Sequence, residues 1–348
     1  MRVLVLGGSW LFGRLIVEDC ARRGFDVTVV NRGLSPAPPP GGVRHLLADR
    51  KSEDDLRALA RAGPWDAVID ISGKIPAVIR RTVQALADVI GRYVSVSTVM
   101  AYRNWPDVPV DEDSLLWDGD PDFDPGPHVW HPDEYGRLKA GCELACRAAL
   151  SDDRLLVIRL HAMLGQYEDA DPVLWWLERM TRRGPALLPA PDRPIQAVDV
   201  RDASRFVVDQ VERGAHGAFN IGAPAERRTY GAMVLACADV VGVEPELVWV
   251  NQDWLVDQGV RQWTDVPLWR NAGAPWAVSV DRALAAGLRC RPLAETAADT
   301  WRWLNSGGRQ ASNERMAGYG LDPAREAAII ARWRAATAPP IAPPAPTA

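Results

Sequence analysis

The sequence predicts a doubly wound α/β fold, in which helices cover both faces of a parallel sheet, followed by a smaller and mostly helical C-terminal lobe. Short runs rich in β-branched residues alternate with helix-length amphipathic segments over the first half of the 348-residue chain. A glycine-rich turn directly follows the first of these runs. Strands that alternate with helices are joined by right-handed crossovers, and such crossovers build a parallel sheet.

The elements are predicted in order along this alternation. Each strand is a short run of aliphatic or aromatic residues, whereas each helix repeats apolar residues at a spacing of three and four. The stretch at 186–194 contains three prolines, so we expect it to be irregular. The predicted strands are 2–6, 26–30, 67–71, 93–97, 155–160 and 218–221, and the predicted helices are 12–23, 52–61, 76–90, 134–149 and 202–213.

These elements divide the chain into two lobes and a tail. Residues 1–165 are predicted to form a dinucleotide-binding domain, to which 195–223 return. Residues 166–194 and 224–334 are predicted to form a substrate-binding lobe, in which helices and Trp-containing loops dominate. Residues 335–348 form a tail rich in Pro and Ala, with little apolar surface to bury.

Composition excludes several classes of protein. The 40 Lys and Arg residues are outnumbered by 45 Asp and Glu residues, so the chain lacks the basic surface of a nucleic-acid binder. No apolar run is long enough to span a membrane, and no signal peptide is recognised at the N-terminus. The five cysteines are an odd and sparse set, which favours a reducing, cytoplasmic location. We expect a small-molecule substrate, and the sequence leaves open whether the chain forms a homodimer.

No metal site is predicted. Cys142 and Cys146 lie four residues apart on an expected helix, but without further ligands they are interpreted as buried apolar residues. His128 and His131 likewise lack a third ligand. Seven of the fifteen tryptophans fall between Trp249 and Trp303, and they either fill the core of the second lobe or stack on a ligand.

The turn after the first strand is typical of a Rossmann-type dinucleotide site. Gly7 allows the tight turn, Gly13 allows close packing of helix on sheet, and the helix N-terminus offers free N–H groups to a pyrophosphate. Trp10 stands where the usual pattern has its middle glycine, and its side chain must turn away from the phosphates or cover the cofactor. The predicted cofactor-binding residues of this turn are Gly7, Ser9, Trp10, Leu11, Phe12 and Gly13.

The end of the second strand indicates which dinucleotide binds. Sites for NAD usually carry a carboxylate there, which accepts hydrogen bonds from the ribose hydroxyls. This chain has Asn31 and Arg32 instead, which favours NADP(H), although NAD(H) stays open and Arg32 has the alternative of being merely solvated. Asp49 is a candidate acceptor for the adenine amino group or, alternatively, a helix N-terminal carboxylate. Arg50, Ser72 and Gly73 are also predicted to line the cofactor site.

A phenol and an ammonium group form the predicted catalytic pair. Tyr135 and Lys139 lie four residues apart, so they share one face of a helix. The nearby cation favours the phenolate, which lets Tyr135 exchange a proton with a carbonyl or alcohol oxygen. Ser97 and Thr98 end the preceding strand at the carboxyl edge of the sheet, where a hydroxyl can polarise a substrate oxygen.

At these residues the chain resembles the extended or atypical short-chain dehydrogenase/reductases, the group of NAD-dependent epimerases and dehydratases. The resemblance covers most of the chain and implies Thr98, Tyr135 and Lys139 as the catalytic set, with Ser97 assisting. Lys139 is also implied to hold the nicotinamide ribose. The segments that carry the resemblance are 7–13, 97–102, 135–139, 193–202 and 217–221.

The chain departs from this family at two places. Dehydratases of the family carry an Asp-Glu pair after the catalytic threonine, whereas Val99 and Met100 stand here, so dehydration is not expected. The segment after the sixth strand is also altered, and it places His161 and Met163 near the nicotinamide or the substrate. His161 is interpreted as a second acid/base or as a structural histidine. The predicted substrate-contacting residues are Thr98, Met100, His161 and Gln196.

Three functions are compatible with these motifs. The first is NADP(H)-dependent reduction of a ketone, or oxidation of a secondary alcohol, on a polar small molecule with Tyr135 as acid/base. The second is an epimerase that retains NAD. The third is a non-catalytic or RNA-binding relative, which the acidic composition and the intact Tyr135 and Lys139 pair disfavour.

Overall fold

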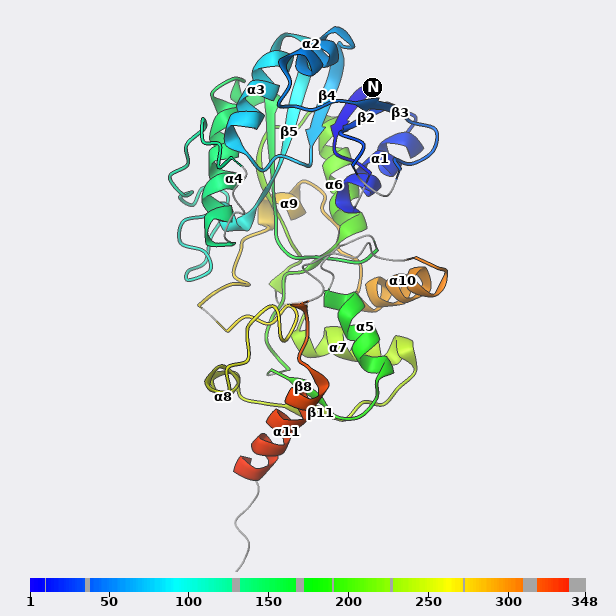
Figure 1. The fold of residues 1–348 in the computed structure, drawn as a ribbon, viewed down its shortest axis with the longest axis vertical. Coiled ribbons are helices and arrows are strands. Elements are labelled where there is room, and N and C mark those ends of the chain that lie inside the picture. Colours follow the sequence, from blue (N-terminus) through cyan, green and yellow to red (C-terminus); the bar gives the residue numbers. More distant parts are fainter. Residues whose placement is uncertain are drawn as a thin grey trace, which may run out of the picture.

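The protein consists of an upper sheet domain and a lower, mostly helical lobe, as the computed structural model in Figure 1 shows. The structure describes residues 1–9, 11–34, 38–126, 132–166, 172–189, 191–225, 228–271, 273–308 and 318–337. The predicted fold class is confirmed, because a parallel sheet with helices on both faces is followed by a helical C-terminal part. None of the helices within these ranges is long and apolar enough to cross a membrane.

Seven strands of the described chain form the central sheet, in the order β10-β6-β5-β4-β1-β2-β3, and all neighbouring strands run parallel. The order reverses at β1, which is where doubly wound sheets open a crevice for ligands. The strands are β1 (Arg2–Leu6), β2 (Asp26–Asn31), β3 (Arg44–Leu47), β4 (Trp65–Asp70), β5 (Ile90–Thr98), β6 (Leu155–Leu160) and β10 (Gly217–Ile221).

The two faces of the sheet bury alternate residues of each strand. Val3 and Val5 of β1 pack beneath α1 and α6, whereas Leu4 and Leu6 pack beneath the helices on the other face. Figure 1 shows α1 and α6 on one side of the sheet and α3 and α4 on the other. The helices of this domain are α1 (Leu11–Arg22), α2 (Glu53–Arg61), α3 (Pro76–Leu86), α4 (Pro132–Arg147), α6 (Val200–Arg213) and α9 (Asp281–Ala285), with short 3-10 turns η1 (Ala87–Val89), η2 (Val99–Ala101) and η3 (Asp152–Arg154).

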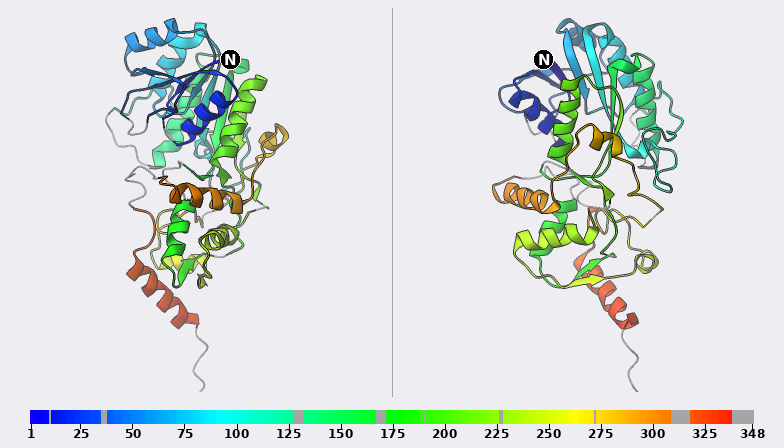
Figure 2. Two further views of the ribbon diagram at one scale, coloured as in Figure 1. Left: turned by 90° about the vertical axis from the view of Figure 1, so that its right-hand side faces the viewer. Right: turned by 180° about the vertical axis from the view of Figure 1, so that it is seen from behind.

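The lower lobe has a hydrophobic core of its own, which includes the buried indoles of Trp176 and Trp269. The two views of Figure 2 show it below the sheet domain, with α11 at its far end. Its elements are α5 (Pro172–Thr181), α7 (Tyr230–Val241), α8 (Gln252–Asp257), α10 (Leu293–Asn305), α11 (Pro323–Thr337), the paired strands β8 (Ala186–Leu188) and β11 (Leu247–Trp249), and the pair β7 (Met163–Leu164) and β9 (Val198–Asp199) at its upper border.

Two predictions of secondary structure are wrong. The helix predicted at 76–90 ends at Leu86, and Ile90 already belongs to β5, where it pairs with Trp65. The segment 186–194 is not irregular throughout, because Ala186–Leu188 forms β8 and pairs with β11 in parallel. In both places a neighbouring strand supplies the hydrogen bonds, and neither the helical spacing of the first segment nor the prolines of the second reveal that neighbour.

Candidate functional site

The turn between β1 and α1 has the close packing that a dinucleotide-binding turn requires. Gly7 and Gly8 adopt φ angles of +112° and +90°, which residues with a Cβ rarely adopt. A Cβ on Gly13 would lie 2.9 Å from the Gly8 nitrogen and 3.0 Å from the Cδ1 atom of Ile71. The three glycines therefore let the start of α1 approach the ends of β1 and β4, and these residues fit a dinucleotide at the helix N-terminus.

Side chains of this turn divide between the core and the end of β2. Phe12 is buried in the core between α1 and the sheet. Ser9 is also buried, and its hydroxyl accepts a hydrogen bond of 2.7 Å from the Asn31 amide nitrogen. The Asn31 amide oxygen in turn accepts the backbone N–H of Gly33 at 2.8 Å. Asn31 therefore joins the turn to the end of β2, while Trp10 lies outside the described residues and the side chain of Leu11 is not described.

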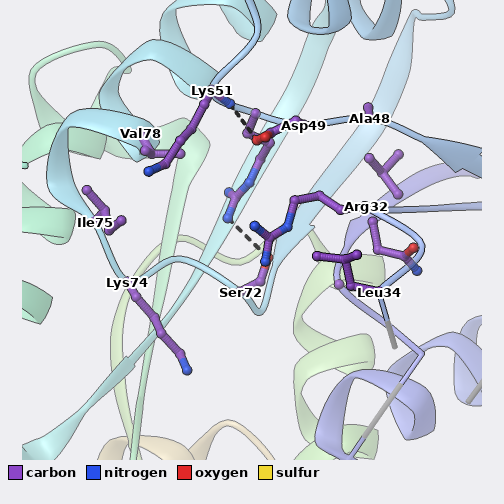
Figure 3. A pocket seen from close by; sticks show the side chains of 13 residues that line it. Arg32, Leu34, Ala48, Asp49, Lys51, Ser72, Lys74, Ile75 and Val78 are labelled. Atoms are coloured by element: carbon purple, nitrogen blue, oxygen red, sulfur yellow. Dashed lines mark hydrogen bonds between the residues drawn. The ribbon is translucent and has the colours of Figure 1, made fainter. Parts of the chain in front are cut away.

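A pocket of about 400 Å³ lies at this edge of the sheet, beside Gly7. Six of the predicted cofactor residues line it, namely Gly7, Asn31, Arg32, Asp49, Arg50 and Ser72. Figure 3 shows that Arg32, Lys51 and Lys74 reach the pocket from three separate segments. The Asp49 carboxylate accepts the backbone N–H of Lys51 at 2.9 Å. Because four cationic residues line the pocket against this one carboxylate, the pocket is rich in positive charge. Its volume is that of a ligand site.

A buried carboxylate at the end of β4 fixes Arg50 in this pocket. Asp70 accepts hydrogen bonds of 2.6 Å from the guanidinium of Arg50 and 2.6 Å from the phenol of Tyr93. Arg50 also donates to the Ser72 hydroxyl at 3.1 Å, a bond drawn in Figure 3. Burial opposes the charge of Arg50, but Asp70 outweighs burial and raises the pKa of Arg50. These hydrogen bonds hold the guanidinium in a fixed position at the pocket, and Asp70 balances its charge.

Lys139 is anchored where β4 and β5 end. Its side chain is 4% exposed, and the ammonium group donates to the carbonyl oxygens of Gly73, at 2.7 Å, and of Val96. Thr98 is the last residue of β5, and its hydroxyl accepts the N–H of Met100 at 3.3 Å. The predicted ammonium and hydroxyl groups therefore both lie at the carboxyl edge of the sheet, the edge that also carries the pocket.

Helix α4 brings Tyr135 to the same edge. A Cβ on Gly136 would lie 2.1 Å from the carbonyl oxygen of Met100, so the first turns of α4 touch η2 directly. Tyr135 immediately precedes Gly136 and is partly exposed. Met100 is partly buried and packs against a small cluster of apolar residues that includes Tyr102 and Trp105. The structure thus places Tyr135 on the helix that borders the strand end carrying Thr98.

Ser97 is buried and belongs to a polar network. Its hydroxyl lies 2.5 Å from a carboxylate oxygen of Glu143, which forms an ion pair of 2.8 Å with Arg159. Burial opposes the charge of Arg159, but Glu143 outweighs it and raises the pKa of Arg159. Arg159 also donates to the Tyr102 hydroxyl at 2.8 Å. The network ties α4, β5 and β6 together behind the site.

The predicted residues after β6 make contacts within the protein. His161 Nε2 contacts the Pro275 carbonyl oxygen at 2.9 Å, and Nδ1 accepts the N–H of Ala162 at 2.7 Å. Its ring stacks on Trp276 with ring centroids 4.8 Å apart, and burial lowers the pKa of His161 to about 4. Gln196 binds both backbone groups of Val278, at 2.7 and 2.9 Å. Met163 lies in β7 and packs against the core beneath α6.

The tryptophans of the lower lobe pack largely within it. Trp269 and Trp276 are buried in the core, and the Trp269 indole donates to Gln252 at 2.9 Å. Trp254 packs on Trp333 of α11 with centroids 5.1 Å apart. The described part of the chain contains no group of three His, Cys, Asp or Glu residues that could hold a metal ion, and His128 and His131 lie outside that part.

Several residues of the site were not predicted, and four of them are charged. Lys51 and Lys74 line the pocket, Asp70 binds Arg50, and Glu143 accepts a hydrogen bond from the hydroxyl of Ser97. A signal exists for the lysines, since each directly follows a predicted cofactor residue in the loop after a strand. Glu143 has a weaker signal: it lies one helical turn after Lys139 on the same face of α4.

Comparison with known proteins places the chain among dinucleotide-binding folds. No protein-family model matches the chain. The 2′-dehydrokanamycin reductase of Streptomyces kanamyceticus is 34% identical over 194 residues, which are 54% of this chain and 51% of that protein. The chloroplast stem-loop binding protein of 41 kDa b from Arabidopsis thaliana is 23% identical over 269 residues, 72% of this chain and 66% of that protein. The chain thus spans about half of the first relative and just under two-thirds of the second.

Solved structures resemble almost the whole chain. The Bordetella bronchiseptica enzyme WbmH in complex with NAD+ has a TM-score of 0.65 and 17% identity, covering 88% of this chain and 99% of that one. The UDP-glucose 4-epimerase of Thermus thermophilus in complex with NAD has a TM-score of 0.60 and 18% identity, covering 86% and 99%. The chain therefore has the fold of the NAD-dependent epimerases of the extended short-chain dehydrogenase/reductase group, and the resemblance predicted from its sequence is confirmed.

Proposed function

We propose that the protein is an NADP(H)-dependent oxidoreductase that reduces a ketone, or oxidises a secondary alcohol, of a polar small molecule. The observation that carries this proposal is the shared sheet edge. Lys139, Thr98 and the first turns of α4 lie at the carboxyl ends of β4 and β5, and the cation-lined pocket opens at the same edge. A related reductase of Streptomyces kanamyceticus supports the assignment to this reaction class.

The residues of the pocket support NADP(H) over NAD(H). Asn31 stands where a carboxylate would bind the ribose hydroxyls of NAD, so no charge there repels a 2′-phosphate. Arg32 and Lys51 make no ion pair with any described residue, whereas Arg50 is engaged by Asp70. A 2′-phosphate would supply the anion that balances Arg32 and Lys51.

The proposed roles of Tyr135, Thr98 and Lys139 are supported by their positions at one edge of the sheet. The nicotinamide, when bound, supplies a hydride to the substrate carbon in reduction and accepts it in oxidation. In the reducing direction the Tyr135 hydroxyl gives its proton to the carbonyl oxygen as the alcohol forms. The Thr98 hydroxyl donates a hydrogen bond to that oxygen. Lys139, one helical turn after Tyr135 on α4, would stabilise the phenolate that is left.

Substitution of Tyr135 tests the proton transfer. Tyr135→Phe removes the hydroxyl and keeps the ring, so we expect turnover to fall by at least about a hundredfold. Affinity for NADP+ should stay within about threefold, because the pocket for the adenosine end is untouched. Steady-state kinetics over a panel of ketones and calorimetric NADP+ binding measure the two effects. Turnover that survives the substitution would transfer the proton-relay role to another group.

An epimerase is the second candidate, because WbmH and the Thermus epimerase share the fold and were solved with NAD. The same residues would serve it if the hydride returned to the opposite face of the substrate carbon. Native mass spectrometry of freshly purified protein separates the two functions. Retained NAD would favour epimerisation, whereas an empty site that takes up NADPH would favour net reduction.

An RNA-binding role is the third candidate, because the Arabidopsis relative is named for stem-loop binding. The net charge of −5 disfavours it. A filter-binding titration with a stem-loop RNA at two salt concentrations tests it directly. Specific, salt-dependent binding together with failure to bind either dinucleotide would overturn the oxidoreductase assignment.

A further inference from the structure

A second pocket, of about 430 Å³, lies beside the start of α9. Three segments that are far apart in sequence build most of it, namely 109–114 after β5, 224–225 after β10, and 276–284, which runs into α9. Figure 1 shows α9 where the sheet domain meets the lower lobe. The two pockets share no residue, and none of the proposed catalytic residues lines the second one. The second pocket is therefore separate from the site described above.

The floor of this second pocket is apolar. Val110, Trp276 and Val278 line it, and each is less than a tenth exposed. The backbone N–H and carbonyl of Val110 bind the backbone of residues 277 and 279, at 3.1 and 2.8 Å. Those of Val278 bind the side-chain amide of Gln196, at 2.9 and 2.7 Å. Because these polar groups are already engaged within the protein, the floor offers a ligand mainly apolar contact.

The charged residues that line this pocket are both acidic. They are Asp111 and Asp281, which are exposed and make no ion pair with any described residue. The Asp111 carboxylate accepts the hydroxyl of Ser114 at 2.8 Å, and the Asp281 carboxylate accepts that of Ser279 at 3.2 Å. These hydroxyls orient the carboxylates without neutralising them, so the rim of an apolar pocket carries two negative charges.

The cation next in sequence to this rim is engaged elsewhere. Arg282 directly follows Asp281, yet its guanidinium forms an ion pair of 3.0 Å with Asp113 and lies 4.0 Å from a carboxylate oxygen of Glu112. Arg282 does not line the pocket. One guanidinium therefore faces the acidic run that Asp111 begins, and an excess of negative charge remains at the rim.

Carboxylates on neighbouring elements are paired, in contrast to those of the rim. Asp199 of β9 forms an ion pair of 2.6 Å with Arg201. Asp202 of α6 forms one of 2.7 Å with Arg291, in the segment after α9. The unpaired carboxylates beside the second pocket are therefore a local feature of its rim, and a cation from outside the chain can balance them.

We propose that this pocket binds a small organic cation, an amine whose apolar part covers the floor and whose ammonium group lies at Asp111 and Asp281. Burial of apolar area and charge-assisted hydrogen bonds to the carboxylates supply the affinity. A hydrated metal ion would gain nothing from the apolar floor, and the rim repels an anion. This inference goes beyond the proposed oxidoreductase function and does not depend on it, because the two pockets have no residue in common.

Calorimetric titration of the full-length protein with three matched probes tests the charge of the ligand. The probes are 2-phenylethylamine, 2-phenylethanol and 3-phenylpropionate, which share an aromatic ring and differ in charge. At pH 7 the amine keeps its proton, as a lysine side chain does. We expect one site for the amine, at least about tenfold weaker binding of the alcohol, and no binding of the carboxylate. Because the rim is exposed to solvent, added salt should weaken binding of the amine.

Substitution of the two carboxylates tests the place of binding. Asp111→Asn and Asp281→Asn each keep an oxygen that can accept the serine hydroxyl and remove one charge. Each should weaken binding of 2-phenylethylamine about threefold, and the double variant about tenfold, because the carboxylates are exposed. Asp257→Asn is the matched control, since Asp257 is exposed on α8, makes no ion pair with the described residues and does not line the pocket. Its titration should equal that of the wild type.

Titration with and without saturating NADP+ separates this inference from the proposed function. Affinity for the amine should stay within about twofold, because the dinucleotide would fill the other pocket. Competition between the two would place the amine in the cofactor pocket and overturn the proposal. Equal binding of amine and alcohol, or unchanged amine binding in the double variant, overturns it as well. If the protein binds no NADP+, the oxidoreductase assignment fails, and the titrations without dinucleotide still decide whether the amine site exists.

Discussion

At the residue scale, the charge of the pocket is set by a few side chains at strand ends. Asn31 is neutral and is engaged by Ser9 and Gly33, so it cannot repel an anion. Arg32 is exposed at the rim, and Lys51 and Lys74 approach from other segments. The expected preference for a phosphorylated ribose depends above all on Arg32 and Lys51, which line the pocket and make no ion pair with any described residue.

Arg32→Gln measures that preference. Loss of a charge-assisted contact to the 2′-phosphate should weaken NADP+ binding by about tenfold or more and leave NAD+ binding within about twofold. Arg44→Gln is the control, since Arg44 is exposed on β3 and does not line the pocket. Calorimetric titration with both dinucleotides gives the ratio. An equal loss for NADP+ and NAD+ would contradict a phosphate-specific role.

His161 illustrates a different residue-scale effect, in which burial suppresses protonation. The pKa of His161 is about 4 in the folded chain, against an ordinary value of 6.5 for histidine. Between these values the unfolded chain binds a proton that the folded chain does not, so acid favours unfolding. Stability should be complete above about pH 6.5 and should fall by about 3 kcal/mol toward pH 4 through this residue.

The prediction for His161 is a difference between two pH profiles. His161→Gln removes the titrating group, so its free energy of unfolding should depend less on pH in this window than that of the wild type. Urea unfolding at several pH values supplies both profiles. Parallel profiles would show that His161 is not the origin of the acid sensitivity.

At the scale of elements, the position of α4 decides whether Tyr135 and Thr98 can act together. The helix touches η2 at Gly136, where there is no room for a side chain. Behind the contact, the Glu143 carboxylate binds Ser97 of β5 and Arg159 of β6. Close approach at one end and a buried ion pair at the other therefore fix the helix against the strand ends.

Gly136→Ala should disturb both stability and turnover. The added methyl group would meet the Met100 carbonyl and force α4 outward, at a cost of about 1–3 kcal/mol. Gly41→Ala is the control, because a Cβ there meets nothing within 4 Å. Thermal unfolding and turnover are the measurements, with NADP+ affinity as a check on the pocket. Unimpaired turnover in Gly136→Ala would mean that the spacing of α4 from β5 tolerates change.

At the scale of the whole molecule, helix α11 packs against the elements that form the core of the lower lobe. Glu326 accepts hydrogen bonds from Arg179 of α5 and from the backbone N–H of Leu187 in β8, at 3.1 and 3.0 Å. Ile329 and Ile330 of the same helix are buried in the core of this lobe. A helix near the C-terminus thus holds together segments from the middle of the chain.

Glu326→Ala should lower the free energy of unfolding of the lower lobe. It would leave Arg179 buried without its partner, which costs about 3 kcal/mol. Glu246→Ala removes an exposed pair with Arg334 in the same lobe and should cost less than about 1 kcal/mol. Calorimetry of thermal unfolding compares the two, and NADP+ binding at 25 °C should be kept in both. An equal effect of the two substitutions would contradict the role of the buried pair.

The sequence by itself determined the alternation of strands and helices in the sheet domain and six of the thirteen residues that line the pocket. The alternation of strands and helices, the glycine turn and Asn31-Arg32 are local patterns, because each depends on residues close together along the chain. In a parallel sheet, residues at the carboxyl ends of successive strands meet at one edge, so Asp49, Arg50 and Ser72 could be assigned from strand order alone.

Only the tertiary structure decided the rest. Three features join residues that are distant in sequence. Ala186–Leu188 pairs with Leu247–Trp249, and Glu143 is buried against Ser97 and Arg159. Arg270 lies between Trp105 and Trp263. No local periodicity encodes such contacts, because their free energy comes from the packing of whole elements. The charge of a side chain can be read from the sequence, but its counter-charge, or the lack of one, is fixed only when the lobes meet.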